Sequence, residues 1–247
     1  MRIVAAIPAR LNSSRLPKKL LRDICGKTLI TRTYEATVNS NLFDDVLVIT
    51  NSSEIIAELE SSKVKYIFDD ANYQTGTDRI AGVASKIEAD IIINVQGDEP
   101  FINSNTIESI LNTFKHDKEN NIKIVSVMTP IKDDQELKNP NNVKVFTDVS
   151  DNAIYFSRHP IPFKNDLNIS KAYKHIGIYA FRKKSLIEFA KLKVGELESS
   201  EKIEALRLIE NDIKIKMINS NDTFIAVSYT HLRAHETSLH LVCRLLL

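Results

Sequence analysis

The segment Ile3-Val4-Ala5-Ala6-Ile7 is continuously apolar and runs directly into Pro8-Ala9-Arg10-Leu11-Asn12-Ser13-Ser14-Arg15-Leu16-Pro17-Lys18-Lys19, a loop with four cationic side chains. A short apolar run of this kind indicates a buried strand. Ligand sites of parallel sheets lie beyond the carboxyl ends of the strands, and Arg and Lys bind phosphate oxygens. We therefore favour a polyphosphate site here over a merely solvated basic loop.

The first half of the chain alternates further apolar runs with segments of helical periodicity. The predicted strands are Val46–Ile49, Lys65–Phe68 and Ile91–Val95, and the predicted helices are Leu29–Thr37, Ser53–Leu59, Thr77–Ile87 and Asn105–Phe114. Buried strands that alternate with helices predict an α/β fold, with a mainly parallel mixed sheet and helices on both faces.

The second half has shorter links and more strands, which predicts a mixed extension of the same sheet. Strands are expected at Lys123–Met128, Val143–Thr147, Ala153–Phe156, Ile176–Phe181, Ile213–Ile218 and Phe224–Val227, with helices at Ser185–Leu192 and Ser200–Ile209. We interpret residues 1–227 as a single domain. Residues 228–247 hold three of the six histidines and differ in composition, so we expect a tail that is not native.

Composition excludes several classes of protein. The chain has 247 residues, with 33 Lys and Arg against 32 Asp and Glu, so nothing indicates bulk binding of nucleic acid. No apolar run approaches the roughly 20 residues of a membrane helix. The two cysteines, Cys25 and Cys243, lack metal-ligand spacing, and a cytoplasmic protein is the simplest interpretation.

Two motifs in the first half carry candidate site residues. In Gln74-Thr75-Gly76-Thr77-Asp78-Arg79, Gly76 permits a tight turn and Thr77 is a plausible N-cap, so the segment is either a nucleotide contact or a plain helix start. Asn94-Val95-Gln96-Gly97-Asp98-Glu99-Pro100 ends an apolar strand with two carboxylates. Magnesium takes one or two protein carboxylates and fills its shell with phosphate and water, which favours Asp98 as a metal ligand.

The second half offers two further candidates. Arg158 follows Tyr155-Phe156-Ser157, and His175 begins His175-Ile176-Gly177-Ile178-Tyr179. Either side chain could meet an anionic substrate, although each alone is more often structural.

In order and spacing, these segments together resemble the CMP-KDO synthetase family of sugar-activating nucleotidyltransferases, over residues 1 to about 227. KDO is the acidic sugar 3-deoxy-manno-octulosonate. The matching residues are Ile7-Pro8-Ala9-Arg10, Ser14-Arg15-Leu16-Pro17 with Lys19, Gly26-Lys27, Gln74–Arg79, Asn94–Pro100, Asn139-Pro140-Asn141, Val143-Lys144-Val145, Tyr155–Arg158, His175–Tyr179, and Glu204 with Leu206-Arg207.

The resemblance implies a fold like that of nucleotide-diphospho-sugar transferases, usually a homodimer, that uses Mg²⁺ to transfer CMP from CTP to KDO for lipopolysaccharide synthesis. It implies phosphate contacts from Arg10, Arg15 and Lys19. Further nucleotide contacts would come from Pro8, Ala9, Gln74, Thr77 and Arg79. Asp98 would bind the metal. Sugar contacts would come from Gln96, Arg158, His175 and Glu204.

The chain departs from the family pattern at two positions. Ser228 stands where the family has an Asp that supplies a second metal ligand, and Ala205 follows Glu204 where the family tends to have Gln. Two alternatives therefore stay open. One is a cytidylyltransferase for a related acidic sugar, such as an amino-KDO or a sialic-acid-like sugar. The other is a nucleotide-binding dimer that is inactive as this polypeptide.

Overall fold

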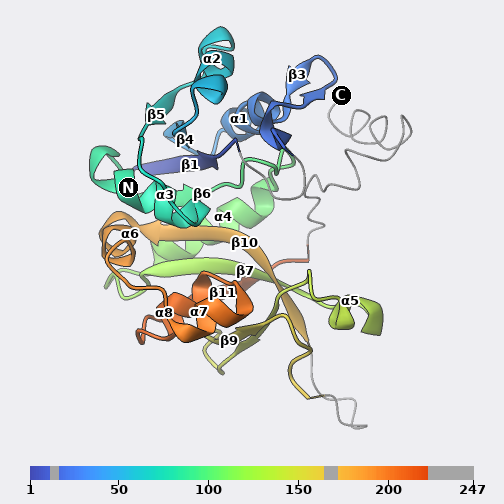
Figure 1. The fold of residues 1–247 in the computed structure, drawn as a ribbon. Coiled ribbons are helices and arrows are strands. Elements are labelled where there is room, and N and C mark those ends of the chain that lie inside the picture. Colours follow the sequence, from blue (N-terminus) through green and yellow to red (C-terminus); the bar gives the residue numbers. More distant parts are fainter. Residues whose placement is uncertain (12–16, 164–171, 222–247) are drawn as a thin grey trace. The chain divides into compact units, whose positions relative to one another are not determined.

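The computed structural model describes residues 1–11, 17–163 and 172–221, which form two compact units, Met1–Ser104 and Asn105–Thr223 (Figure 1). The predicted strand Phe224–Val227, Ser228 and the rest of the tail lie outside the described residues, as does Arg15. The interpretation of residues 1–227 as a single domain stays a prediction. No helix in the described ranges is both long and apolar enough to cross a membrane.

The first unit is built on parallel strands in the order β6-β1-β4-β5. Its elements are β1 (Ile3–Ala9), η1 (Lys19–Leu21), β2 (Asp23–Ile24), β3 (Lys27–Thr28), α1 (Leu29–Asn39), β4 (Asp45–Thr50), α2 (Ser53–Ser61), β5 (Tyr66–Phe68), α3 (Gly76–Val83), η2 (Ala84–Lys86) and β6 (Ile91–Asn94). The strands and helices predicted for this half are confirmed, except that the helix predicted at Thr77–Ile87 is an α-helix only to Val83 and continues as the 3-10 helix η2.

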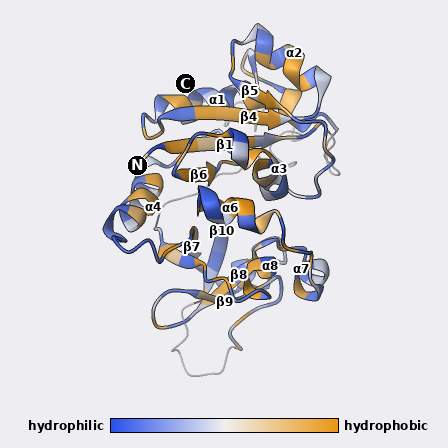
Figure 2. Ribbon diagram, turned by 90° about the vertical axis from the view of Figure 1, so that its left-hand side faces the viewer, coloured by the Kyte–Doolittle hydropathy of each residue, from blue (hydrophilic) through white to orange (hydrophobic). Residues whose placement is uncertain are grey.

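Both faces of this sheet are covered. Every side chain of Ile3–Ile7 is buried, and successive strand residues point to opposite faces. The helices α1 and α3 both pack against β1 and β4. Figure 2 shows hydrophobic residues along β1, β4 and β6, as expected for parallel strands with two covered faces.

The second unit contains a mixed sheet in which β11 runs parallel to β7, while β10 runs antiparallel to β7 and β8. Its elements are α4 (Ser104–His116), β7 (Ile124–Pro130), α5 (Asp134–Lys138), β8 (Lys144–Thr147), β9 (Ala153–Ser157), β10 (Tyr173–Arg182), α6 (Lys183–Phe189), α7 (Glu196–Glu201), α8 (Ala205–Ile209) and β11 (Lys216–Asn219). The predicted fold class, a mainly parallel mixed sheet with helices, is confirmed.

One helix predicted in the second half is in fact two separate helices. Ser200–Ile209 is not a single helix, because α7 ends at Glu201 and is followed by Lys202, whose φ of 56° is left-handed. A left-handed residue after the last helical turn is a common way for a helix to end. The chain then turns through Ile203 into α8.

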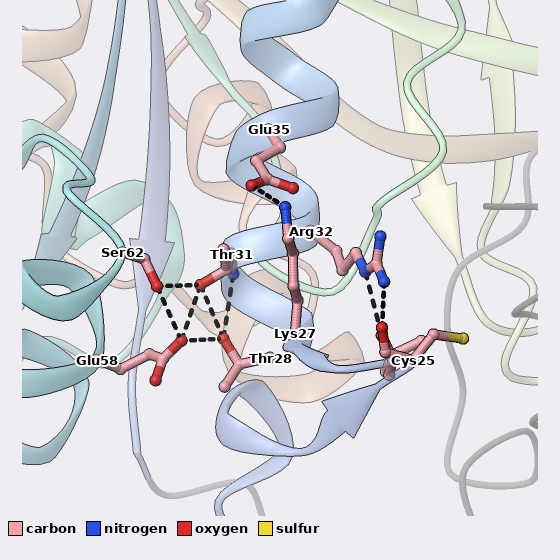
Figure 3. A network of polar contacts seen from close by, with 9 residues as sticks. Cys25, Lys27, Thr28, Thr31, Arg32, Glu35, Glu58 and Ser62 are labelled. Carbon is pink, nitrogen blue, oxygen red and sulfur yellow. Dashed lines mark hydrogen bonds and ion pairs between the residues drawn. The ribbon is translucent and has the colours of Figure 1, made fainter. Parts of the chain in front are cut away.

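A polar network fixes the start of α1 (Figure 3). The Glu58 carboxylate of α2 accepts hydrogen bonds from the hydroxyl groups of Thr28, Thr31 and Ser62 at 2.9, 3.0 and 3.2 Å. Arg32 donates to the Cys25 carbonyl in the β2–β3 hairpin at 2.6 Å. These bonds join α1 to α2 and to the hairpin, so α1 is held at its amino end.

Candidate functional site

A cavity of about 410 Å³ lies where β1 and β4 end. Its lining residues are Arg10, Leu11, Asn51, Ser52, Ser53, Glu54, Asn72, Tyr73 and Arg79. Arg10 directly follows β1, and Asn51 directly follows β4, where Ser52 caps α2 by accepting a hydrogen bond from the Ile55 amide. The structure therefore brings Arg10 and Arg79 together at the carboxyl edge of the parallel strands, as predicted for ligand sites of such sheets.

Arg79 is the buried cation of this cavity. Its side chain is 4% exposed, and its guanidinium lies 5.5 Å from the centre of the Tyr73 ring. Loss of solvent lowers its pKa, which the nearby Arg10 charge lowers further. Nη1 makes no hydrogen bond within the described residues. A buried cation with an unused donor favours an anionic ligand in this cavity.

Tyr73, whose ring lies against the Arg79 guanidinium, is itself held in place by Asp69. Its hydroxyl donates a hydrogen bond of 2.5 Å to Asp69 Oδ2. Burial and that hydrogen bond raise the pKa of Tyr73 to about 12, so the phenol stays protonated. Gly82 is required here, because a Cβ at this position would come within 1.9 Å of the Tyr73 hydroxyl oxygen. The aromatic support of Arg79 was missed by sequence reasoning.

Thr75 caps α3, so the prediction that Thr77 is the N-cap is wrong. The Thr75 side chain accepts from the Asp78 amide at 3.0 Å, and Thr75 itself has extended backbone geometry. The spacing Thr-x-x-Asp is a known start signal and could have identified this cap. Thr77 is instead buried and accepts from Asn94 Nδ2 at 3.0 Å, which ties α3 to β6.

The remaining predicted nucleotide contacts from this part of the chain differ in exposure. Ala9 is fully buried in β1, so its side chain cannot meet a ligand without movement of the strand. Pro8 lies under the start of α3, where a Cβ on Gly76 would come within 3.0 Å of Pro8 Cγ. Gln74 is exposed in the loop before α3.

Asp98 lies in a tight turn after β6. The Glu99 amide donates to the Gln96 carbonyl at 3.0 Å, and Thr33 of α1 donates to the Gly97 carbonyl at 3.0 Å. A Cβ on Gly97 would come within 3.2 Å of the Pro8 carbonyl oxygen, so glycine permits the close approach of this turn to β1. Gln96 itself is partly exposed.

Lys19 and Asp98 form an ion pair in which Nζ lies 2.5 Å from Asp98 Oδ2. Asp98 Oδ1 has no hydrogen bond to another described residue, and the side chain is 35% exposed. Burial raises the pKa of the neighbouring Glu99 to about 7, and the Asp98 charge adds to that rise. Asp98 is therefore the carboxylate of this turn with an oxygen available to a cation.

The described residues contain no group of three or more His, Cys, Asp or Glu side chains arranged to hold a metal. The donor set nevertheless fits Mg²⁺, which takes one or two protein carboxylates and completes its octahedron with phosphate oxygens and water. Asp98 Oδ1 is the oxygen that would fill such a role.

In the second unit, Arg158 is held by backbone carbonyls. Its Nε donates to the Glu201 carbonyl at 2.7 Å and its Nη1 to the Pro140 carbonyl at 2.9 Å. Its own amide donates to the Glu201 carboxylate at 2.8 Å. Nη2 also reaches the Lys202 carbonyl at 3.4 Å, so three of the five guanidinium N–H groups donate to backbone carbonyls. A contact with the substrate must therefore use the two remaining N–H groups.

Lys144, which lies in a segment that carries the family resemblance, is a positioning group to which the sequence alone assigned no role. It is fully buried, and its Nζ donates to the carbonyls of Asn139, Asn142 and Arg158 at 3.1, 2.8 and 2.5 Å. Burial lowers its pKa, and the Glu201 charge partly opposes that shift. A buried ammonium with three carbonyl partners fixes the backbone around Arg158.

His175 lies between aromatic rings in the same unit. Its ring centre is 5.0 Å from that of Phe156 and 5.2 Å from that of Tyr179. Burial lowers the pKa of His175 to about 3, so the imidazole is neutral near pH 7. Burial, followed by the charges of Glu204 and Glu198, raises the pKa of Tyr179 well above its usual value. Glu204 is partly exposed at the start of α8.

Stability should fall as the pH drops because of His175. The pKa is about 3 in the folded chain and 6.5 in the unfolded one, so between these values only the unfolded chain binds the proton. The free energy of unfolding of the parent should therefore decrease from about pH 7 to about pH 5 more steeply than that of His175→Gln. Urea denaturation of both proteins at the two pH values measures this, and equal slopes would contradict it.

Comparison with known proteins places the chain in a family. The family model described as Cytidylyltransferase matches residues 4–215. A curated 3-deoxy-manno-octulosonate cytidylyltransferase from Christiangramia forsetii is 47% identical over 89% of each chain. One from Flavobacterium johnsoniae is 45% identical over 92% of this chain and 93% of its own.

A solved structure supports the same assignment. It is described as CMP:2-keto-3-deoxy-manno-octonic acid synthetase complexed with CTP, and it matches with a TM-score of 0.90 and 33% identity over 99% of both chains. The resemblance read from the spacing of the motifs is confirmed. The chain belongs to the 3-deoxy-manno-octulosonate cytidylyltransferase family.

Proposed function

We propose that this chain transfers CMP from CTP to KDO and releases pyrophosphate. The cavity that contains Arg10 and the buried Arg79 at the carboxyl edge of the sheet carries the proposal, because it suits an anionic nucleotide. Relatives that are 45–47% identical over about nine-tenths of the chain are described as 3-deoxy-manno-octulosonate cytidylyltransferases. Their names support CTP as the nucleotide and KDO as the acceptor. A related structure, 33% identical, is described as complexed with CTP.

The reaction makes one bond and breaks one. The anomeric hydroxyl oxygen of KDO attacks the α-phosphorus of CTP, the bond from that phosphorus to the bridging oxygen breaks, and pyrophosphate leaves with the electron pair. The hydroxyl proton passes to solvent. Negative charge grows on phosphoryl oxygens, so we assign the cationic side chains of Arg10, Arg15, Lys19 and Arg79 to its stabilisation. Positioning of the two substrates supplies the rest of the rate.

We assign Asp98 as the protein ligand for Mg²⁺. When bound, Mg²⁺ stabilises charge on the phosphate oxygens. Lys19 Nζ pairs with Oδ2 of Asp98, which orients the carboxylate and leaves Oδ1 for the cation. The turn at Gly97, fastened by Thr33, keeps this carboxylate at the end of β6.

We assign Gln96, Arg158, His175 and Glu204 to contacts with the sugar acid. Support for the second-unit residues comes from the way the fold fixes them: Arg158 through Glu201 and Lys144, and His175 through its aromatic neighbours. Rigidly held side chains are suited to positioning a substrate. Because Ala205 stands where the family tends to have Gln, a related acidic sugar remains the alternative acceptor.

We further propose a cytoplasmic homodimer that serves lipopolysaccharide synthesis. Phe146 of β8 and Ile154 of β9 are 42% and 49% exposed, and Phe163 is 90% exposed. Contiguous exposed apolar patches are typical of interaction surfaces, and Phe146 and Ile154 lie on the paired strands β8 and β9. Light scattering should give twice the monomer mass for the parent, and a monomer at all concentrations would contradict the dimer.

A panel of acceptors distinguishes KDO from the alternatives. Pyrophosphate release should be measured with CTP and KDO, an amino-KDO and sialic acid, and kcat/KM should be largest for KDO. A preference for another sugar would overturn the acceptor assignment. Binding of CTP without turnover would instead favour the inactive dimer, and Ser228→Asp then tests whether a second carboxylate restores turnover.

A further inference from the structure

The strand β10 carries an irregularity beside His175. Its register with β7 pairs Ile176 with Val127 and then Tyr179 with Ser126, so three steps along β10 match one step along β7, and Gly177 and Ile178 are extra residues. Such bulges change the direction of side chains and are frequent beside active sites. The Ile178 carbonyl within this bulge points to the side chain of Ser126, whose hydroxyl lies 2.7 Å away.

Ser126 has two polar neighbours but only one proton. Its fully buried hydroxyl lies 2.7 Å from the Ile178 carbonyl oxygen and 2.9 Å from His175 Nε2. A carbonyl can only accept a hydrogen bond, so the hydroxyl proton is donated to Ile178. The Ser126 oxygen must then accept, which makes His175 Nε2 the nitrogen that carries hydrogen.

The other ring nitrogen of His175 is left with a lone pair. A neutral imidazole carries one N–H, and the ring is neutral because burial lowers its pKa to about 3. Nδ1 makes no hydrogen bond to any other described residue, while the residue keeps some exposure. The carboxylates Glu204 and Glu198 raise the pKa of the adjacent Tyr179, whereas burial is what lowers the pKa of His175. A neutral acceptor nitrogen can meet a hydroxyl group but repels a carboxylate.

We propose that Ser126 is a positioning residue that fixes His175 as the Nε2–H tautomer, so that Nδ1 accepts a hydrogen bond from a hydroxyl group of the sugar. The inference rests on the proposed function. It narrows the expected role of His175 from contact with an anionic substrate to a hydrogen bond with one hydroxyl group of the sugar.

The tautomer can be measured without any activity. Nitrogen-15 NMR of the histidine-labelled parent, with His175→Gln to assign the signals, should show a protonated Nε2 and an unprotonated Nδ1 near neutral pH. Ser126→Ala should give a mixture of tautomers at His175, and Ser126→Thr, which keeps the hydroxyl, should resemble the parent. A parent that carries hydrogen on Nδ1 would overturn the proposal, whether or not the variants fold.

Kinetics test the contact with the sugar. Ser126→Ala should raise KM for KDO about tenfold and leave KM for CTP unchanged, because one hydrogen bond to the sugar is weakened. Ser126→Thr should restore the parent value. A set of KDO analogues that each lack one hydroxyl group identifies the group that His175 contacts. The analogue without that group should bind the parent and Ser126→Ala equally well, because the contact is absent from both. Equal loss with every analogue, or an equal rise in both KM values, would overturn the hydroxyl contact. No turnover with KDO by either the parent or Ser228→Asp refutes the proposed function, whereas the NMR result still decides the tautomer.

Discussion

Replacing Asp98 by Asn is expected to lower kcat by about two to three orders of magnitude, the range seen when a group that stabilises transition-state charge is lost. The amide keeps the shape of the side chain but removes the negative charge that faces Lys19 and would hold Mg²⁺. The dependence of kcat on Mg²⁺ concentration should shift to higher concentration in the same variant. Steady-state release of pyrophosphate measures both effects.

Asp90→Asn is the matched control for this prediction. Asp90 directly precedes β6 and lies at the other end of the same strand, where it accepts a hydrogen bond from the Arg2 amide at 2.6 Å. Its loss should leave kcat within about twofold of the parent, because surface substitutions away from a site have small effects. Similar losses in both variants would show that carboxylates matter for folding rather than for the metal.

Replacing Arg207 by Met is expected to cost about 3–5 kcal/mol of unfolding free energy. Its guanidinium forms two bonds with the Glu198 carboxylate, at 2.6 and 2.7 Å, and both side chains are less than a tenth exposed. It also packs 4.5 Å from the centre of the Phe189 ring. Removal of one partner leaves a buried charge without compensation, and chemical denaturation measures the loss.

Two further variants isolate the cause. The double variant Glu198→Met with Arg207→Met should recover part of the loss, because no unpaired charge remains. Lys65→Met removes an ion pair with Asp45 in which the lysine is 63% exposed, so it should change stability by less than about 1 kcal/mol. A double variant less stable than Arg207→Met alone would argue that packing, not charge, dominates.

The strands of the first unit could be predicted because burial on both faces leaves an uninterrupted apolar run, as in Ile3–Ile7 and Ile91–Ile93. The hairpin of β2 and β3 could not, because its few residues depend on a left-handed Cys25 and Gly26 and on contacts with Arg32. The break at Lys202 is likewise a backbone choice that helical periodicity does not reveal.

The candidate site was predictable where its residues follow strands, as Arg10 and Asp98 do. Tyr73 escaped notice because its importance comes from stacking on Arg79, which only the fold creates. Ser126 lies 49 residues from His175 along the chain and meets it only through the register of β7 and β10. Contacts of this kind follow from tertiary pairing and leave no local pattern in the sequence.

Transfer of label from CTP is the most direct test of the central claim. CTP labelled at the α-phosphorus should be incubated with the protein, Mg²⁺ and KDO. The label should appear in a sugar conjugate in equal amount to the pyrophosphate released, and only when KDO is present. Absence of labelled conjugate with both the parent and Ser228→Asp, although CTP binds, would contradict the assignment as a CTP:KDO cytidylyltransferase.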